Sequence, residues 1–124
     1  MAEYSRDSSF NMGIAHLTRI DGLLYMVAEA SSENDYNGWL DALNLLNREV
    51  FFLYNKTEME ESIENENACV DCIRRFQEEK TIDAKRGVYN SLVKYEYFIK
   101  KQLADRKMLM AFGKDLKVSI SDLG

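Results

Sequence analysis

Apolar side chains recur along most of this chain at the spacing of an α-helix. The longest such pattern covers residues 83–112, where successive apolar positions are mostly three or four residues apart. They form one stripe on a single helix. The stripe is Val88, Leu92, Tyr95, Ile99, Leu103 and Met110. A rod of about 30 residues, 1.5 Å each, cannot bury this stripe alone, so other helices must cover it.

A first helix is predicted over residues 9–30. Its main stripe is Phe10, Ile14, Leu17, Ile20, Leu24 and Val27. Leu23, Met26 and Ala30 widen this stripe beyond what one neighbouring helix covers. Gly22 weakens the helix by about 1 kcal/mol relative to alanine, or else it permits close approach of another backbone.

A second helix is predicted over residues 36–54, with Asp35 as its N-cap. Its stripe is Trp39, Leu43, Leu46, Val50 and Leu53, which alternates spacings of four and three as in a heptad seam. Ala42, Leu45 and Phe52 add a second apolar flank. This pattern indicates a helix that is covered on two sides.

A third helix is predicted over residues 58–79, because Thr57 and Glu60 fit a capping box. Its stripe is Met59, Ile63, Val70, Ile73 and Phe76. Glu66 interrupts this stripe. The alternative for the first half is therefore a polar loop over residues 55–67, followed by a short helix.

The fourth helix can be capped by Thr81 or Asp83, and Gly113 fits its C-terminal stop. Residues 114–124 then alternate apolar and polar positions, which is a strand-like period. Four helices with short connections predict an all-α, antiparallel up-down four-helix bundle with a short C-terminal extension. Residues 1–124 form a single domain in this interpretation, with residues 1–8 as a mobile arm.

Composition agrees with a folded helical domain and limits the classes of molecule that it could bind. The chain has no proline, 46% hydrophobic residues and a formal net charge of −5. An acidic chain is not generally attracted to nucleic acid or to anionic membranes. No apolar run approaches the roughly 20 residues that span a bilayer, and the N-terminus lacks the apolar core of a signal peptide. We therefore expect a cytoplasmic protein that binds neither membranes nor nucleic acid.

Cys69 and Cys72 form the one motif that could carry chemistry. A zinc site needs four ligands, and His16 is the only histidine. A di-iron bundle needs glutamates three residues before histidines, and Gly13 stands at that position before His16. Three interpretations remain: packing cysteines, a redox-sensitive pair or a metal site shared by two chains. The first is favoured, so we expect no cofactor, no metal and no catalytic residue.

Charge is distributed unevenly, with acidic residues before residue 80 and an excess of basic ones after it. An acidic cluster precedes a basic, aromatic strip that includes Lys100. The residues that could bind a protein partner are Glu58, Glu60, Glu61, Glu64, Lys94, Tyr97 and Lys101. The simpler interpretations are a solvated helix face and charge complementarity between the third and fourth helices.

The pattern favours a non-enzymatic protein-interaction or assembly module that acts through helix faces as a homodimer. The residues expected at the self-association surface are Leu23, Met26, Leu45 and Phe52. Its composition suits a virus- or phage-encoded accessory protein. One alternative is an acidic inhibitor that occupies a cationic site on a host protein. Another is a redox or metal-binding protein that uses Cys69 and Cys72.

Overall fold

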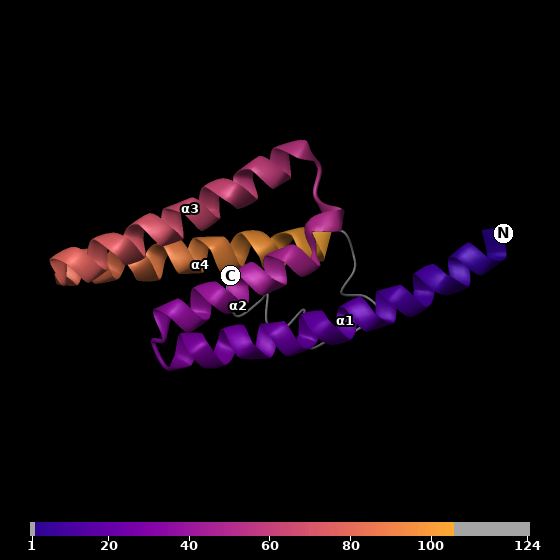
Figure 1. The fold of residues 1–124 in the computed structure, drawn as a ribbon, viewed down its shortest axis with the longest axis horizontal. Coiled ribbons are helices and arrows are strands. Elements are labelled where there is room, and N and C mark those ends of the chain that lie inside the picture. Colours follow the sequence, from indigo (N-terminus) through magenta and orange to yellow (C-terminus); the bar gives the residue numbers. More distant parts are fainter. Residues whose placement is uncertain (1, 106–124) are drawn as a thin grey trace.

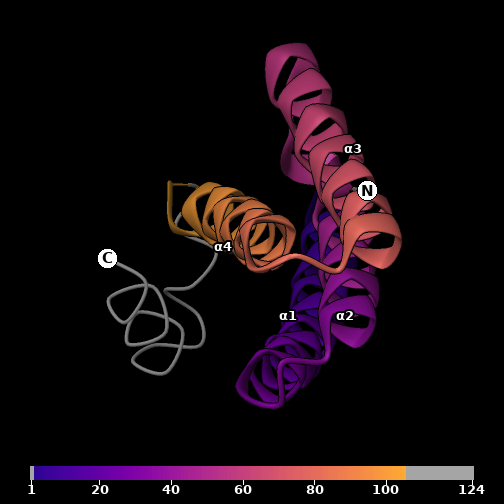
Figure 2. The ribbon, with the colours of Figure 1, turned by 90° about the vertical axis from the view of Figure 1, so that its left-hand side faces the viewer.

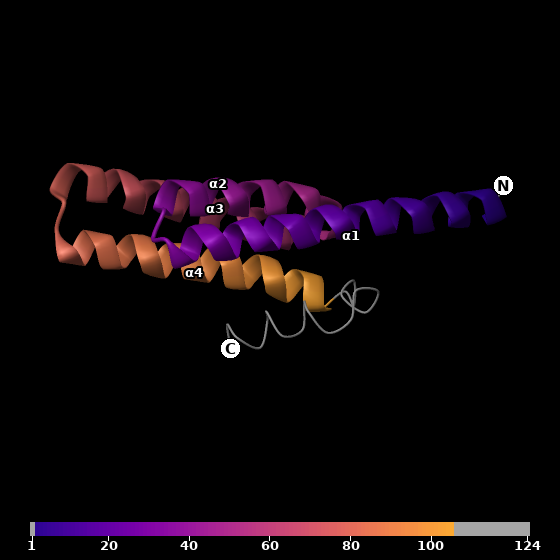
Figure 3. The same cartoon turned by 90° about the horizontal axis from the view of Figure 1, so that it is seen from below.

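The computed structural model describes the backbone of residues 2–105 and the side chains of residues 17–105. The regular elements of this part are all helical: α1 (Ala2–Ser32), α2 (Tyr36–Glu49), a 3-10 turn η1 (Phe51–Leu53), α3 (Lys56–Glu79) and α4 (Ile82–Asp105). Consecutive α-helices run antiparallel (Figures 1 and 3). The predicted all-α antiparallel bundle is confirmed.

The helices form two hairpins. α1 packs chiefly on α2, and α3 packs on α4. The hairpins meet where α2 packs on α4 and, less extensively, on α3, as the end-on view in Figure 2 shows. Among the described residues, no helix covers the side of the α1–α2 hairpin that faces away from α3 and α4.

Local backbone chemistry fixes the turn between α1 and α2. Asn34 takes the left-handed conformation with φ of 56°, which asparagine tolerates better than most residues. The Asp35 N–H donates to the Ala30 carbonyl at 2.9 Å, as in a Schellman motif. The Asp35 carboxylate then accepts the Gly38 N–H at 3.1 Å. The predicted N-cap of α2 is confirmed.

The start of α3 corrects the predicted capping box. Asn55, not Thr57, is the N-cap: its side chain accepts the Glu58 N–H at 2.8 Å, and the Glu58 carboxylate accepts the Asn55 N–H at 3.0 Å. Asn55 is an equally good cap and has a glutamate at the required third position. Residues 56–67 are consequently helical, so the loop alternative is wrong.

The buried face of α3 differs from the predicted stripe. Ile63 and Val70 are 48% and 36% exposed. The buried residues are Ser62, Asn65, Cys69 and Ile73. Polar partners explain this rotation, because the buried Asn47 amide donates to Ser62 Oγ at 2.5 Å and accepts from the Tyr54 hydroxyl at 2.7 Å.

The ends of the other helices differ in detail from the prediction. α1 begins at Ala2, so residues 2–8 continue the helix instead of forming an arm; neither proline nor glycine occurs before Gly13 to end it. α2 ends at Glu49, where a run of bulky residues turns into η1.

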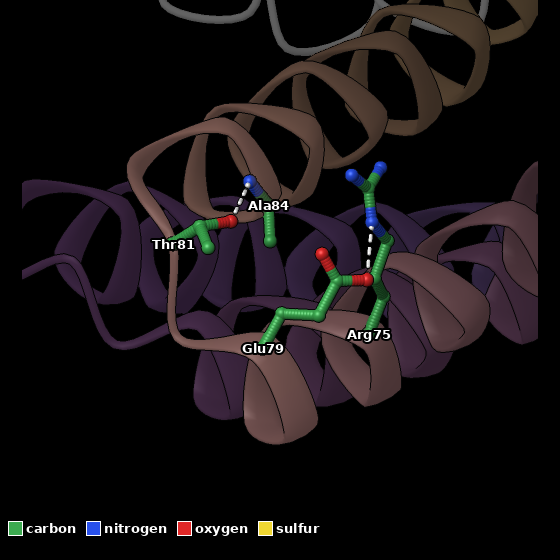
Figure 4. A network of polar contacts seen from close by, with 4 residues as sticks. All are labelled: Arg75, Glu79, Thr81 and Ala84. Carbon is green, nitrogen blue, oxygen red and sulfur yellow. Dashed lines mark hydrogen bonds and ion pairs between the residues drawn. The ribbon is translucent and has the colours of Figure 1, made fainter.

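At the corner between α3 and α4, Thr81 is the residue that caps the fourth helix. Its hydroxyl accepts the Ala84 N–H at 3.1 Å, beside the Arg75–Glu79 ion pair (Figure 4). Gly113 and the expected extension at residues 114–124 lie outside the described residues.

The core confirms the predicted stripes of the first, second and fourth helices over the described side chains. Its fully buried members include Ile20, Val27, Leu43, Leu46, Val50, Val88, Leu92, Tyr95 and Ile99. A buried ion pair also lies within this core. The buried Glu96 accepts Trp39 Nε1–H at 2.8 Å and pairs with Lys100 Nζ at 3.0 Å, which links α2 to α4.

Candidate functional site

The uncovered side of the α1–α2 hairpin carries a shallow groove, which we name the hairpin groove. It consists of two adjoining hollows that share Met26. The larger, of about 420 Å³, is lined by Arg19, Gly22, Leu23, Met26, Leu45 and Glu49. The smaller, of about 220 Å³, is lined by Met26, Glu29, Ala30, Glu33, Asp35, Gly38 and Ala42. The groove therefore follows the seam between the two helices from one end of the hairpin to the other.

Helical periodicity and the tight turn together build this lining. On both helices the lining residues are mostly three or four apart, so they share one face. The turn places Glu33 beside Asp35 at one end. At the other end Arg19 and Glu49 form an ion pair. This register puts Met26 opposite Ala42 at the middle of the groove.

Apolar side chains around the groove remain open to solvent. Met26 and Leu45 are 48% and 47% exposed, and Leu23 is half-buried. Phe52, in η1, is 60% exposed just beyond the end of α2. Of the four residues expected at a self-association surface, the structure thus brings Leu23, Met26 and Leu45 together. A contiguous exposed apolar surface of this kind commonly marks an interaction site.

Small residues form the floor of the groove, and the sequence prediction identified three of them: Gly22 as a possible close approach, and Ala30 and Ala42 as parts of the apolar flanks. Ala30, Gly38 and Ala42 line the smaller hollow, and Gly22 lines the larger. A Cβ atom added at Gly22 would meet nothing within 4 Å, so the space above it is open. Gly38 was not identified; the signal that could have found it is its spacing of four residues from Ala42 on the same face of the helix.

The two ends of the groove differ in charge. At one end Arg19, whose side chain is 54% exposed, accompanies the partly buried Glu49. Exposed Arg48 lies at the same end. The turn end carries three acidic residues on its rim: Glu29, Glu33 and Asp35. This polarity was not predicted, because it depends on the pairing of the two helices.

The predicted acidic cluster lies on α3, away from the groove. Glu60, Glu61 and Glu64 are exposed there, as a solvated helix face requires. Glu58 is half-buried and completes the capping box, so it has a structural role. One of the four predicted partner-binding glutamates is therefore already used to begin a helix.

The predicted basic strip lies on α4. Lys94, Tyr97 and Lys101 are exposed and share one face at spacings of three and four. Lys100 does not belong to this strip. It is buried and pairs with Glu96, because its position on the helix turns it towards the core.

The two cysteines lie in different environments, Cys69 buried and Cys72 half-buried. Cys69 is fully buried, and its thiol donates to the Ser91 carbonyl at 3.3 Å. Burial raises the pKa of the Cys69 thiol to about 11, so little thiolate is present at neutral pH. Within residues 17–105, no group of three His, Cys, Asp or Glu side chains is placed to hold a metal ion.

The two thiols should differ in reactivity. We expect iodoacetamide to modify the half-buried Cys72 well before Cys69, which should react only after unfolding. Peptide mapping by mass spectrometry measures both modification rates, and equal rates would contradict the buried placement.

The fold favours the protonated form of the Cys69 thiol. The contribution of this group to the free energy of unfolding is therefore present below the ordinary thiol pKa and is lost as pH rises through about 11.

In comparisons with known proteins, no family model, no curated protein and no solved structure matches this chain. Over the described part of the chain, no helix combines the length and apolarity needed to cross a membrane.

Proposed function

We propose that this chain is a non-enzymatic protein-interaction module that assembles as a homodimer through the hairpin groove. The observation that carries the proposal is the open apolar seam between α1 and α2. Met26 and Leu45 project there about half exposed, beside hollows floored by glycine and alanine.

A second copy of the chain suits this surface because the surface has complementary parts. It carries projecting side chains, Met26 and Leu45, and it also carries the hollows that could receive them. Two-fold self-pairing uses one patch twice and is the commonest closed symmetry among soluble oligomers. Burying these side chains also removes exposed apolar surface from water.

The two alternatives from the sequence have less support. An acidic inhibitor would use the cluster on α3, but Glu58 already serves the capping box. A redox or metal protein would need an ionisable Cys69, whereas burial keeps that thiol protonated. Neither alternative uses the apolar groove.

The test compares two apolar-to-lysine substitutions of matched exposure. Leu45 lies in the groove and is 47% exposed, whereas Ile63 lies on the outer face of α3 and is 48% exposed. Lysine is a good helix former, and in each case two acidic residues lie three or four positions away on the same helix: Asp41 and Glu49 for position 45, Glu60 and Glu66 for position 63. Because burying a leucine contributes about 1.5–3 kcal/mol, Leu45→Lys should raise the dimer Kd by about 10- to 100-fold.

Analytical ultracentrifugation over a concentration series measures this Kd. The wild-type chain should give a mass of two chains, each of 14.4 kDa, and Ile63→Lys should behave like it. A single-chain mass for the wild type at all concentrations would overturn the proposal. Equal weakening by both substitutions would show that association does not use the groove.

A further inference from the structure

We propose that the two copies pack antiparallel, about a two-fold axis at the level of Met26 and Ala42, with Arg19 of one copy against Glu33 of the other. This inference rests on the proposed self-association through the hairpin groove. It adds the orientation of the copies and the charged residues that select it.

The spacing along α1 is symmetric about Met26. Arg19 and Glu33 are each seven residues from it, and Gly22 and Ala30 are each four residues away. In the antiparallel arrangement the two-fold axis crosses the groove at right angles at Met26. It places α1 of one copy on α1 of the second copy, with the two helices running in opposite directions. It therefore brings Arg19 opposite Glu33, and Gly22 opposite Ala30, twice in each dimer.

The small residues make this packing possible. Helix axes approach to about 8 Å only where the contact residues are small. Gly22 has open space above it, and Ala30 lies in the floor of the smaller hollow. On α2, Ala42 lies opposite Met26 at the level of the axis. Where the helices of the two copies approach most closely, the contact residues are thus small ones or the flexible Met26.

Charge selects the antiparallel orientation over the parallel one. In the parallel arrangement the two-fold axis runs along the groove, and it would bring the turn ends of both copies together. Each turn end carries Glu29, Glu33 and Asp35, so six carboxylates would converge. The antiparallel axis instead sets each acidic end against the end that carries Arg19 and Arg48. Glu49 also lies there and pairs with Arg19 within its own chain through Arg19 Nε, which leaves the terminal guanidinium nitrogens of Arg19 to meet Glu33 of the second copy. Asp35 lies opposite Glu49 in this arrangement, because each is seven residues from Ala42. Each end of the antiparallel dimer therefore sets two arginines against four carboxylates, whereas the parallel one gathers six carboxylates at one end.

Cysteine cross-linking distinguishes the two orientations. In a background with Cys69→Ala and Cys72→Ser, a Met26→Cys dimer has its two new thiols next to the axis. A short bis-maleimide should link most of these chains. Glu33→Cys is the matched control on the same helix face, because the antiparallel axis separates its two thiols by roughly 21 Å along α1. Linkage of Glu33→Cys as efficient as that of Met26→Cys would overturn the proposed orientation, because an axis along the groove keeps each residue level with its own copy.

Charge reversal provides a second readout that does not depend on new thiols. Glu33→Arg faces Arg19 of the second copy and should weaken the dimer at least tenfold in low salt. Adding Arg19→Glu should restore most of the affinity, although it breaks the Arg19–Glu49 pair within each chain. A double variant as weak as Glu33→Arg alone would overturn the Arg19–Glu33 contact.

The two proposals fail in different ways. A monomeric wild-type chain overturns both self-association and orientation. A dimer that Leu45→Lys weakens, but in which Met26→Cys is not linked, overturns the antiparallel orientation alone.

Discussion

Replacing Glu96 by alanine should lower the free energy of unfolding by about 3–5 kcal/mol, the usual cost of removing one partner from a buried ion pair. The carboxylate pairs with Lys100 Nζ at 3.0 Å and accepts the Trp39 indole N–H at 2.8 Å. All three residues are buried. Without the carboxylate, an ammonium group stays in the core unpaired and the indole N–H loses its acceptor.

The control for this variant removes the charges and keeps the acceptor. Glu96→Gln still offers an amide oxygen to Trp39, and Lys100→Met replaces the ammonium with an apolar chain of similar length. Because buried ion pairs can be replaced by apolar residues at little cost, the double variant should lie within about 1.5 kcal/mol of wild type. Urea unfolding followed by circular dichroism, at one protein concentration, measures both. Equal losses in the single and double variants would contradict a coupled pair.

The second and fourth helices could be predicted from the sequence because their buried positions hold large apolar residues. Leu43 and Leu46 on α2, and Val88, Leu92 and Ile99 on α4, repeat at helical spacing and are all fully buried. In such segments hydrophobic periodicity reports burial directly.

α3 could not be oriented in the same way. Ser62 and Asn65 are buried there, and Ile63 is about half exposed. The polar pair is tolerated because Asn47 bonds to Ser62 from α2, and the Asn65 amide donates to the Glu61 carbonyl at 2.9 Å. Burial of Ser62 depends on Asn47, a partner on another helix, so the period of apolar residues alone assigns the wrong face.

The candidate surface was predictable only in its apolar part. Surplus apolar residues on two helices identified Leu23, Met26 and Leu45, which the structure brings together. The acidic turn end and the Arg19–Glu49 pair depend on how α1 and α2 are aligned. That register follows from the conformation of Asn34 in the turn, which the sequence pattern left unspecified.

Leu43→Ala and Ile99→Ala should each lower the free energy of unfolding by about 2–5 kcal/mol, whereas Lys101→Ala should leave it nearly unchanged. Leu43 and Ile99 have no exposed surface and lie on α2 and α4, which pack on each other. Truncation of either side chain therefore leaves a cavity that the two packed helices cannot fill by moving together. Lys101, next but one to Ile99, faces solvent. Urea unfolding of the three variants at one protein concentration gives the comparison. Similar losses in all three would mean that the packing of α2 on α4 is not the core of this fold.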